Sequence, residues 1–268
     1  MSKGVKAEDM KFSIIVVSLN AGKELLKTVE SILMQTYKDF EILVKDGMSE
    51  DGSIETLPVD DRIRLIRKKD RSIYDAMNQA VEEATGDYEI FLNCGDYFYD
   101  EKVLARIAKE IAGNPADIYY GQLYRRIQQS VDEPAHEITD FVCYRNIPCH
   151  QACVYGKKMF LQGGYDLNYP VRADYEHFLR CRYESGAVFH YMPFVIASYE
   201  GGGFSETKDN LKRAAEEHKR ITQKYLGAKC VLYRGIMVVT LQPLRKWIAD
   251  NPRLSGGYQR LKAMLYRK

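Results

Sequence analysis

Mostly apolar runs and amphipathic segments alternate through the first hundred residues of this chain. The apolar runs, typical of strands buried on both faces of a sheet, are residues 13–18, 40–44, 63–66 and 87–92. Residues 23–34 and 72–84 instead place apolar side chains at helical spacing, along one face. Strands and helices that alternate over short connections predict a parallel sheet with right-handed crossovers. The predicted fold class is α/β, with a Rossmann-like, mostly parallel central sheet flanked by helices.

The pattern is less regular after residue 100. We expect a helix near residues 101–111, another from residue 173, and further strands at 118–121, 150–155 and 194–199. No internal repeat, low-complexity segment or flexible linker interrupts this region. Residues 1–227 are therefore predicted to form one domain.

Residues 228–268 differ from the rest of the chain in charge. They hold nine Lys or Arg and one acid, Asp250, a net charge of +8 where the whole chain has +2. Apolar side chains are interleaved with the basic ones, which is typical of an amphipathic helical tail at an anionic membrane surface. The longest uncharged stretch, residues 235–244, is far shorter than the roughly twenty residues that span a bilayer. A helix folded back on the domain is the alternative.

The expected location is cytoplasmic, at the inner face of the plasma membrane. Residues 1–11 are polar, so no secretory signal is predicted. The six cysteines show no C-x-x-C spacing, and Cys149, His150 and Cys153 lack the second cysteine pair that a zinc site needs. Reduced thiols of a cytoplasmic protein are the simpler interpretation.

Two common nucleotide-binding motifs are missing, but carboxylates end two of the predicted strands. No G-x-G-x-x-G follows the first strand and no G-x-x-x-x-G-K-[ST] occurs, which argues against dinucleotide and P-loop sites. Asp46 and Asp96 come at strand ends, where open α/β sheets bind ligands. Asp96 suits Mg²⁺ or Mn²⁺ carrying a diphosphate, and Asn93 could orient it or contact a sugar. Ordinary turn or cap carboxylates are the alternative.

Several short motifs occur in one order along residues 13–205. They are Ser13–Asn20, Gln35–Tyr37, Phe40–Ser53, Ile73–Asn78, Thr85–Tyr88, Leu92–Asp96 and Gly202–Ser205. Together they resemble the inverting glycosyltransferases of family 2, whose fold is called GT-A. The resemblance implies sugar transfer from a nucleotide-sugar donor, most simply a UDP-sugar. It implies a glycan or a polyprenyl-diphosphate-linked glycan as acceptor, and no nucleic acid as partner.

The resemblance assigns a donor side. Ser18 and Asn20 would contact the base and ribose, and Asp46 would accept a hydrogen bond from the base. Asp75 and Asn78, about one helical turn apart, would reach the sugar. An alternative of equal weight is that the Asp75 carboxylate only stabilises the N-terminus of its own helix.

The metal motif departs from the common Asp-x-Asp of the family. Asn93 and Asp96 supply one acid where Asp-x-Asp supplies two. We expect the GT-A fold to be kept, and the departure leaves open how strongly the activity depends on a metal. The cofactor implied is a divalent metal, Mg²⁺ or Mn²⁺. A glycine-hinged loop would close over the donor and expel water; its residues include Gly202, Gly203 and Ser205.

The resemblance also assigns an acceptor side. An acid at the start of a downstream helix acts as general base in this family, and Asp174 matches that position. Glu176 is the reserve candidate. His150 and Gln151 match a motif expected to help form the acceptor side. A structural histidine and a plain N-terminal helix acid remain the alternatives for His150 and Asp174.

Two other functions remain open on the sequence alone. A sugar-nucleotide pyrophosphorylase also begins with a nucleotide-binding sheet, but residues 18–22 lack the arginine that its glycine-rich loop needs. A non-catalytic nucleotide-sugar-binding protein would be expected to lose Asp96 or Asp174, and both are present. Nucleoside diphosphate release from a nucleotide sugar separates the transferase from both.

Overall fold

The computed structural model describes residues 10–201, 207–239, 244, 247–248 and 251. The chain divides into two compact units, Met1–Ile221 and Thr222–Lys268. The first unit contains the whole sheet and most of helix α6 (Lys208–Leu226). The second contains the end of that helix and helix α7 (Lys229–Val239).

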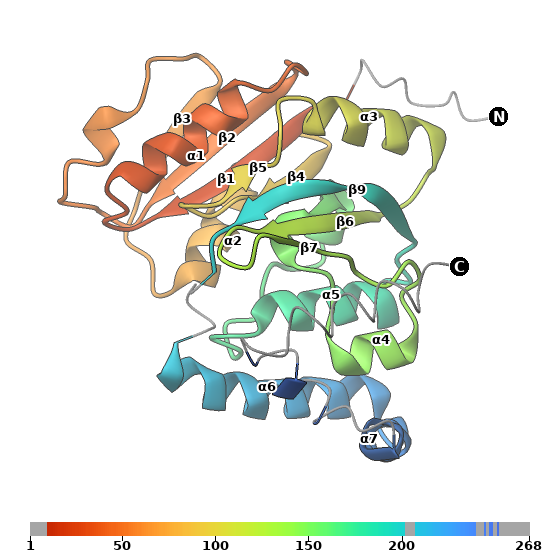
Figure 1. The fold of residues 1–268 in the computed structure, drawn as a ribbon. Coiled ribbons are helices and arrows are strands. Elements are labelled where there is room, and N and C mark those ends of the chain that lie inside the picture. Colours follow the sequence, from red (N-terminus) through yellow and green to blue (C-terminus); the bar gives the residue numbers. More distant parts are fainter. Residues whose placement is uncertain (1–9, 202–206, 240–243, 245–246, 249–250, 252–268) are drawn as a thin grey trace. The chain divides into compact units, whose positions relative to one another are not determined.

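Strands and helices alternate along the first unit, as Figure 1 shows. The strands are β1 (Phe12–Ser18), β2 (Phe40–Asp46), β3 (Ile63–Arg67), β4 (Tyr88–Phe91), β5 (Tyr97–Phe98), β6 (Ile118–Arg125), β7 (Ser130–Asp132), β8 (Cys153–Gly156) and β9 (Phe189–Tyr199). The α-helices before α6 are α1 (Lys23–Leu33), α2 (Ile73–Glu82), α3 (Val103–Gly113), α4 (Asp140–Arg145) and α5 (Ala173–Tyr183). Short 3₁₀ helices cover Ile54–Thr56, His150–Ala152 and Lys157–Met159.

The described strands form one sheet of nine, in the order β3-β2-β1-β4-β8-β6-β9-β5, with β7 paired to β6. The first four are parallel, so their carboxyl ends meet at one edge. In this register Ser18 lies opposite Asp46, and Asp46 lies opposite Arg67. Strand β8 is antiparallel to both β4 and β6, whereas β6 and β9 run parallel. The predicted α/β fold with a mostly parallel sheet flanked by helices is confirmed.

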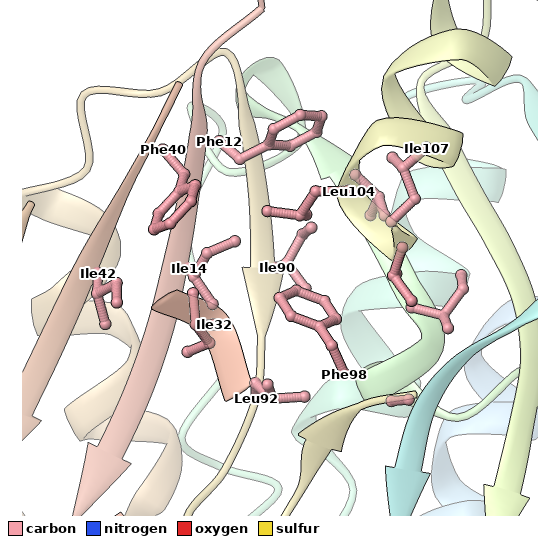
Figure 2. Packing of buried hydrophobic residues seen from close by; sticks show 14 of the residues in the cluster. Phe12, Ile14, Ile32, Phe40, Ile42, Ile90, Leu92, Phe98, Leu104 and Ile107 are labelled. Atoms are coloured by element: carbon pink, nitrogen blue, oxygen red, sulfur yellow. The ribbon is translucent and has the colours of Figure 1, made fainter. Parts of the chain in front are cut away.

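One face of the sheet packs against α1 and α3. Alternate residues of the parallel strands point into this cluster because successive side chains of a strand face opposite sides. Figure 2 shows the packing of ten labelled members: Phe12, Ile14, Ile32, Phe40, Ile42, Ile90, Leu92, Phe98, Leu104 and Ile107. All ten are buried. The cluster fixes the strands whose ends carry the polar residues of the site.

The opposite face packs against α2 and an aromatic cluster. Phe91 of β4 contacts the rings of Tyr155, Phe160 and Tyr165, with centroids 5.5–6.2 Å apart. Tyr165 in turn lies 5.3 Å from the ring of Tyr74 on α2. Edge-to-face and tilted ring contacts of this kind add to the energy of burial. Helix α2 is thereby joined to the segment that precedes α5.

Some elements differ from those predicted. His150–Ala152 is a 3₁₀ turn, and the strand expected at 150–155 begins only at Cys153. Strand β9 is longer than expected, because it begins at Phe189. Strands β5 and β7 and helix α4 were not predicted. These elements are two to six residues long, too short to show a hydrophobic period.

In the second unit, helix α7 exposes several large apolar side chains. Val231, Leu232 and Val238 are more than half exposed. Within the described part of the chain, no helix is both long enough and apolar enough to cross a membrane.

Candidate active site at the carboxyl edge of the sheet

Asp46 ends β2 and is fully buried. Its carboxylate accepts hydrogen bonds from the backbone N–H and the hydroxyl of Ser49, at 3.0 and 2.5 Å. The guanidinium of Arg67, at the end of β3, lies 3.2 Å away. These contacts fold the loop after β2 back over the strand end. The predicted contact of Asp46 with a base stays a prediction, since its oxygens already accept hydrogen bonds within the loop.

The buried ammonium of Lys45 fastens the neighbouring β3–α2 connection. Its Nζ donates to the backbone oxygen of Lys68 at 2.5 Å and to Asp70 Oδ2 at 2.8 Å. Asp70 consequently lies so close to Gly47 that a Cβ there would meet Oδ2 at 2.9 Å. Only glycine fits this position without a shift of its neighbours. A buried charge of this kind is tolerated because it is paired and hydrogen-bonded.

Asn20 connects the loop after β1 to the loop after β2. Its N–H donates to Ser49 Oγ at 2.8 Å, and its side-chain oxygen accepts from the N–H of Glu50 at 3.0 Å. Asn20 has a φ of 50°, in the left-handed region that asparagine enters more readily than most residues. Ser18, one of the predicted base contacts, is buried at the end of β1. Ser18, Asn20 and Asp46 therefore lie together at the edge, as the sequence predicted.

Asp96 lies in the turn after β4 and is almost completely buried. Its N–H donates to the backbone oxygen of Asn93 at 2.9 Å, and Gly95 has a φ of 92°. Arg126 of the β6–β7 connection holds the turn, since its guanidinium donates to Gly95 O at 2.5 Å and lies over the ring of Tyr97. The turn is thus fixed by a cation that the sequence analysis did not single out.

Burial raises the pKa of Asp96 to about 6, against the opposing effect of a hydrogen bond from Gln151. Gln151 Nε2 donates to Asp96 Oδ2 at 3.0 Å. Asn93 Oδ1 is also buried and accepts no hydrogen bond from the described residues. The buried carboxyl of Asp96 and the unpaired amide oxygen of Asn93 are both oxygen ligands of the kind that a bound divalent cation would satisfy.

The oxygen ligands of Asp96 and Asn93 fit a divalent cation whose other ligands come from outside the protein. Among the described residues, no three His, Cys, Asp or Glu side chains are grouped as a metal site. Asp96 would supply one carboxylate, and a bound diphosphate and water would supply the rest. Affinity for metal without the diphosphate is therefore expected to be weak.

Asp174 lies in the first turn of α5. The hydroxyl of Tyr74 donates to its Oδ1 at 2.8 Å, and His150 Nδ1 lies 3.4 Å from its Oδ2. Burial by itself raises the pKa of Asp174, but the hydrogen bonds from His150 and Tyr74 and the charge of Arg172 outweigh it. The net effect is a pKa below the usual value, so Asp174 is ionised near neutral pH and able to accept a proton.

The 3₁₀ turn His150–Ala152 joins the two carboxylates. The ring of His150 lies between Asn93 and Asp174, with Nε2 3.3 Å from Asn93 Nδ2 and Nδ1 3.4 Å from Asp174 Oδ2. The next residue, Gln151, contacts Asp96. His150 and Gln151 were predicted on the acceptor side, and the structure places them between Asp96 and Asp174.

The reserve candidate Glu176 is far less accessible than Asp174. Its side chain is 1% exposed and has Arg180 at 4.0 Å, whereas the side chain of Asp174 is 20% exposed. A general base must reach the proton that it removes. The geometry therefore favours Asp174 over Glu176.

Asp75 and Asn78 are committed to contacts within the protein. Asp75 pairs with Arg71 at 3.1 Å and accepts from its backbone N–H. Asn78 holds the backbone of Tyr165, accepting from its N–H at 2.7 Å and donating to its oxygen at 2.9 Å. The predicted sugar contacts of both residues stay predictions. Gly202, Gly203 and Ser205, the expected lid, lie outside the described residues.

Tyr74 was part of a motif in the sequence, but its contact with Asp174 could not be read there. The two residues are a hundred positions apart. The sequence indicated only that Tyr74 directly precedes Asp75 at the start of an amphipathic helix.

The chain was compared with known protein families. The sequence model for glycosyl transferase family 2 matches residues 13–168, more than half of the chain. The chain belongs to this family. The match covers the donor-side residues and the turn with Asp96, and it includes His150 and Gln151, but it ends before Asp174.

Two curated relatives of this family 2 glycosyltransferase are proteins of Mycobacterium tuberculosis. A PGL/p-HBAD biosynthesis glycosyltransferase of Mycobacterium tuberculosis is 37% identical over 213 residues, covering 75% of this chain and 83% of the relative. An uncharacterized glycosyltransferase of the same species is 31% identical over 222 residues, covering 78% and 84%.

Solved glycosyltransferases have the same fold. Staphylococcus aureus TarS, solved with UDP-GlcNAc, has a TM-score of 0.61 at 17% identity, covering 89% of this chain and 79% of that one. The mannosyltransferase PcManGT of Pyrobaculum calidifontis, solved with GDP-Man and Mn²⁺, has a TM-score of 0.57 at 16% identity, covering 96% and 87%.

Proposed function

We propose that this family 2 glycosyltransferase moves a sugar from a nucleoside diphosphate sugar, a UDP-sugar, to a hydroxyl of a glycan or lipid-linked glycan, with inversion. The observation that carries the proposal is the pair of carboxylates joined by His150 and Gln151. Asp96 is buried with a raised pKa, and Asp174 is hydrogen-bonded with a lowered one. Two acids whose surroundings separate their pKa values in this way suit two different roles. The neighbours solved with UDP-GlcNAc and with GDP-Man support the class of donor.

Asp174 acts as the general base of the transfer. Its carboxylate takes the proton of the acceptor hydroxyl while that oxygen attacks the anomeric carbon. The bond from the anomeric carbon to the diphosphate oxygen breaks on the opposite face, so the configuration inverts. His150 and Tyr74 hold the carboxylate in position, and they stabilise its ionised form before the proton arrives.

Asp96 and Asn93 serve the leaving group. A divalent metal, when bound, would neutralise the charge that develops on the diphosphate. Gln151 fixes the Asp96 carboxylate, and Arg126 fixes the backbone of its turn. The neighbour solved with Mn²⁺ supports a metal in this role.

Release of nucleoside diphosphate tests the proposed function. The purified protein, incubated with single UDP- and GDP-sugars, Mn²⁺ and candidate glycan acceptors, is expected to release nucleoside diphosphate with one donor and faster with acceptor present. The Asp174→Asn protein serves as a control for contaminating hydrolases. Formation of a nucleoside triphosphate from donor and pyrophosphate would instead indicate a pyrophosphorylase. Donor binding without any turnover would indicate a binding protein.

We also propose that residues 1–227 form the catalytic domain and that residues 228–268 attach it to an anionic membrane surface. Helix α7 exposes apolar side chains, with Val231 at 77%, and nine basic residues lie in this tail. Each basic residue near an anionic leaflet contributes about 1 kcal/mol. Attachment of this kind suits a lipid-linked acceptor and places the enzyme at the inner face of the plasma membrane.

The full chain is expected to sediment with vesicles containing anionic lipid, and a chain that ends at Gly227 is expected to stay in solution. Salt should weaken the binding, because the Debye length falls from about 10 Å at 0.1 M to about 3 Å at 1 M. Vesicles of neutral phosphatidylcholine are the control. Equal sedimentation of the two chains, or binding that salt does not change, would contradict the proposal.

A further inference from the structure

The segment just before α5 is held by a buried carboxylate of another helix. Glu217 of α6 is 3% exposed, and its Oε2 accepts from the N–H of Val171 at 3.0 Å and from that of Arg172 at 2.8 Å. Arg172 is the residue at the N-terminal cap of α5, and its own side chain makes no capping bond. N–H groups at a helix start have no partner within the helix, and negative charge is favourable there. Glu217 therefore supplies the cap that the local sequence lacks.

Helix α2 holds the same segment from a second direction. The hydroxyl of Tyr74 donates to the backbone oxygen of Val171 at 3.0 Å and to Asp174 Oδ1 at 2.8 Å. Residue 171 is thus fixed through its N–H by Glu217 and through its oxygen by Tyr74. Asp174 follows three residues later, at a position that these two bonds define.

We propose that Glu217 is a positioning residue for catalysis, which holds the first turn of α5 so that Asp174 meets His150 and the acceptor hydroxyl. The inference rests on the proposed role of Asp174 as base. A displacement of about 1 Å at a reacting group can cost roughly a hundredfold in rate. The hydrogen bonds of Glu217 go to residues 171 and 172, and no contact found among the described residues joins it to the turn that carries Asp96, so we expect donor binding to be independent of it.

Other contacts keep α6 packed on the first unit when this carboxylate is removed. His218 Nε2 lies 3.0 Å from the backbone oxygen of Tyr144, and its ring stacks on Tyr175 at 4.9 Å. Ala214 and Ile221 are buried on the same helix. A hollow lies beside Glu217, open enough for water to replace a removed carboxylate, and its lining residues are mostly polar or charged: Asn168, Pro170, Arg213, Glu216, Glu217 and Arg220. Variants of Glu217 are therefore expected to fold.

The test compares Glu217→Ala and Glu217→Gln with Glu216→Ala. Alanine leaves both N–H groups without their acceptor, and kcat should fall about 10- to 100-fold, as expected for a misplaced base. The KM for donor should stay within about threefold of wild type, because only the acceptor side is disturbed. Glutamine keeps an oxygen that can accept both bonds, so kcat should recover to within about fivefold of wild type. Glu216 is the exposed neighbour on the same helix, so its removal controls for the lost charge.

Several outcomes would overturn the proposal. A folded Glu217→Ala protein with wild-type kcat would do so, as would a rise in donor KM that matches the fall in kcat. If the alanine variant does not fold, Glu217→Asp decides, because it keeps the charge but shortens the reach by one methylene; full activity would then count against positioning. Asp174→Asn is measured in parallel. Wild-type turnover by that variant would refute the assigned base, whereas its loss with an unaffected Glu217→Ala would refute this inference alone.

Discussion

Asp96→Ala is expected to lower sugar transfer by at least about 10²- to 10³-fold while the protein stays folded. The substitution removes the carboxylate that would hold a metal on the donor diphosphate, so charge on the leaving group is no longer stabilised. The fold should survive because Asp96 lies in a turn that Arg126 fixes through the backbone of Gly95, not through the carboxylate. Loss of one electrostatic contact of this kind commonly costs about 10²- to 10³-fold. Turnover is measured by nucleoside diphosphate release at saturating donor and Mn²⁺.

Thermal stabilisation gives a second readout for the same variant. Wild-type protein should be stabilised more by UDP with Mn²⁺ than by either alone, since ligands that bind the native state raise its apparent stability. Asp96→Ala should lose the added effect of the metal. The exposed acid Asp61 provides a control, because Asp61→Ala should match wild type in both measurements. Near-normal turnover by a folded Asp96→Ala protein would show that the acid has been misassigned.

Asp174→Asn is expected to lower turnover by about 10²- to 10⁴-fold, the usual contribution of a positioned general base. The amide keeps the shape of the carboxylate and can still accept a hydrogen bond from Tyr74, but it cannot take a proton. Donor affinity should hardly change, because the base acts on the acceptor. Steady-state kinetics at varied donor and acceptor separate the two effects.

Glu176→Gln is the matched comparison. Glu176 lies two residues along the same helix and is 1% exposed, so its substitution tests stability more than chemistry. A crippled Glu176→Gln beside an active Asp174→Asn would reverse the two roles. Analysis of the product anomer would check inversion independently of both variants.

The parallel half of the sheet could be predicted because its signals are local. Strands β1 and β2 are buried on both faces, and mostly apolar runs are the pattern typical of such burial. The carboxyl ends of parallel strands share one edge, so the placement of Asp46 and Asp96 followed from strand direction alone.

The second half depended on contacts between distant residues. His150 was expected in a strand, but its ring lies between Asn93 and Asp174, and a 3₁₀ turn brings it there. Neither partner is near His150 in the sequence, so local propensity could not reveal the turn. The cap from Glu217 to residues 171 and 172 spans more than forty positions and was missed for the same reason.

The position of β8 has a consequence for synthesis of the chain. Strand β4 pairs with β1 on one side and with β8 on the other, yet Cys153–Gly156 follow β4 by more than sixty residues. During translation the first four strands can pair early, but the outer edge of β4 stays open until β8 leaves the ribosome. An unpaired apolar strand edge is prone to association with other chains. A ribosome paused between residues 100 and 150 should therefore display a nascent chain that binds chaperones more strongly than one paused beyond residue 200.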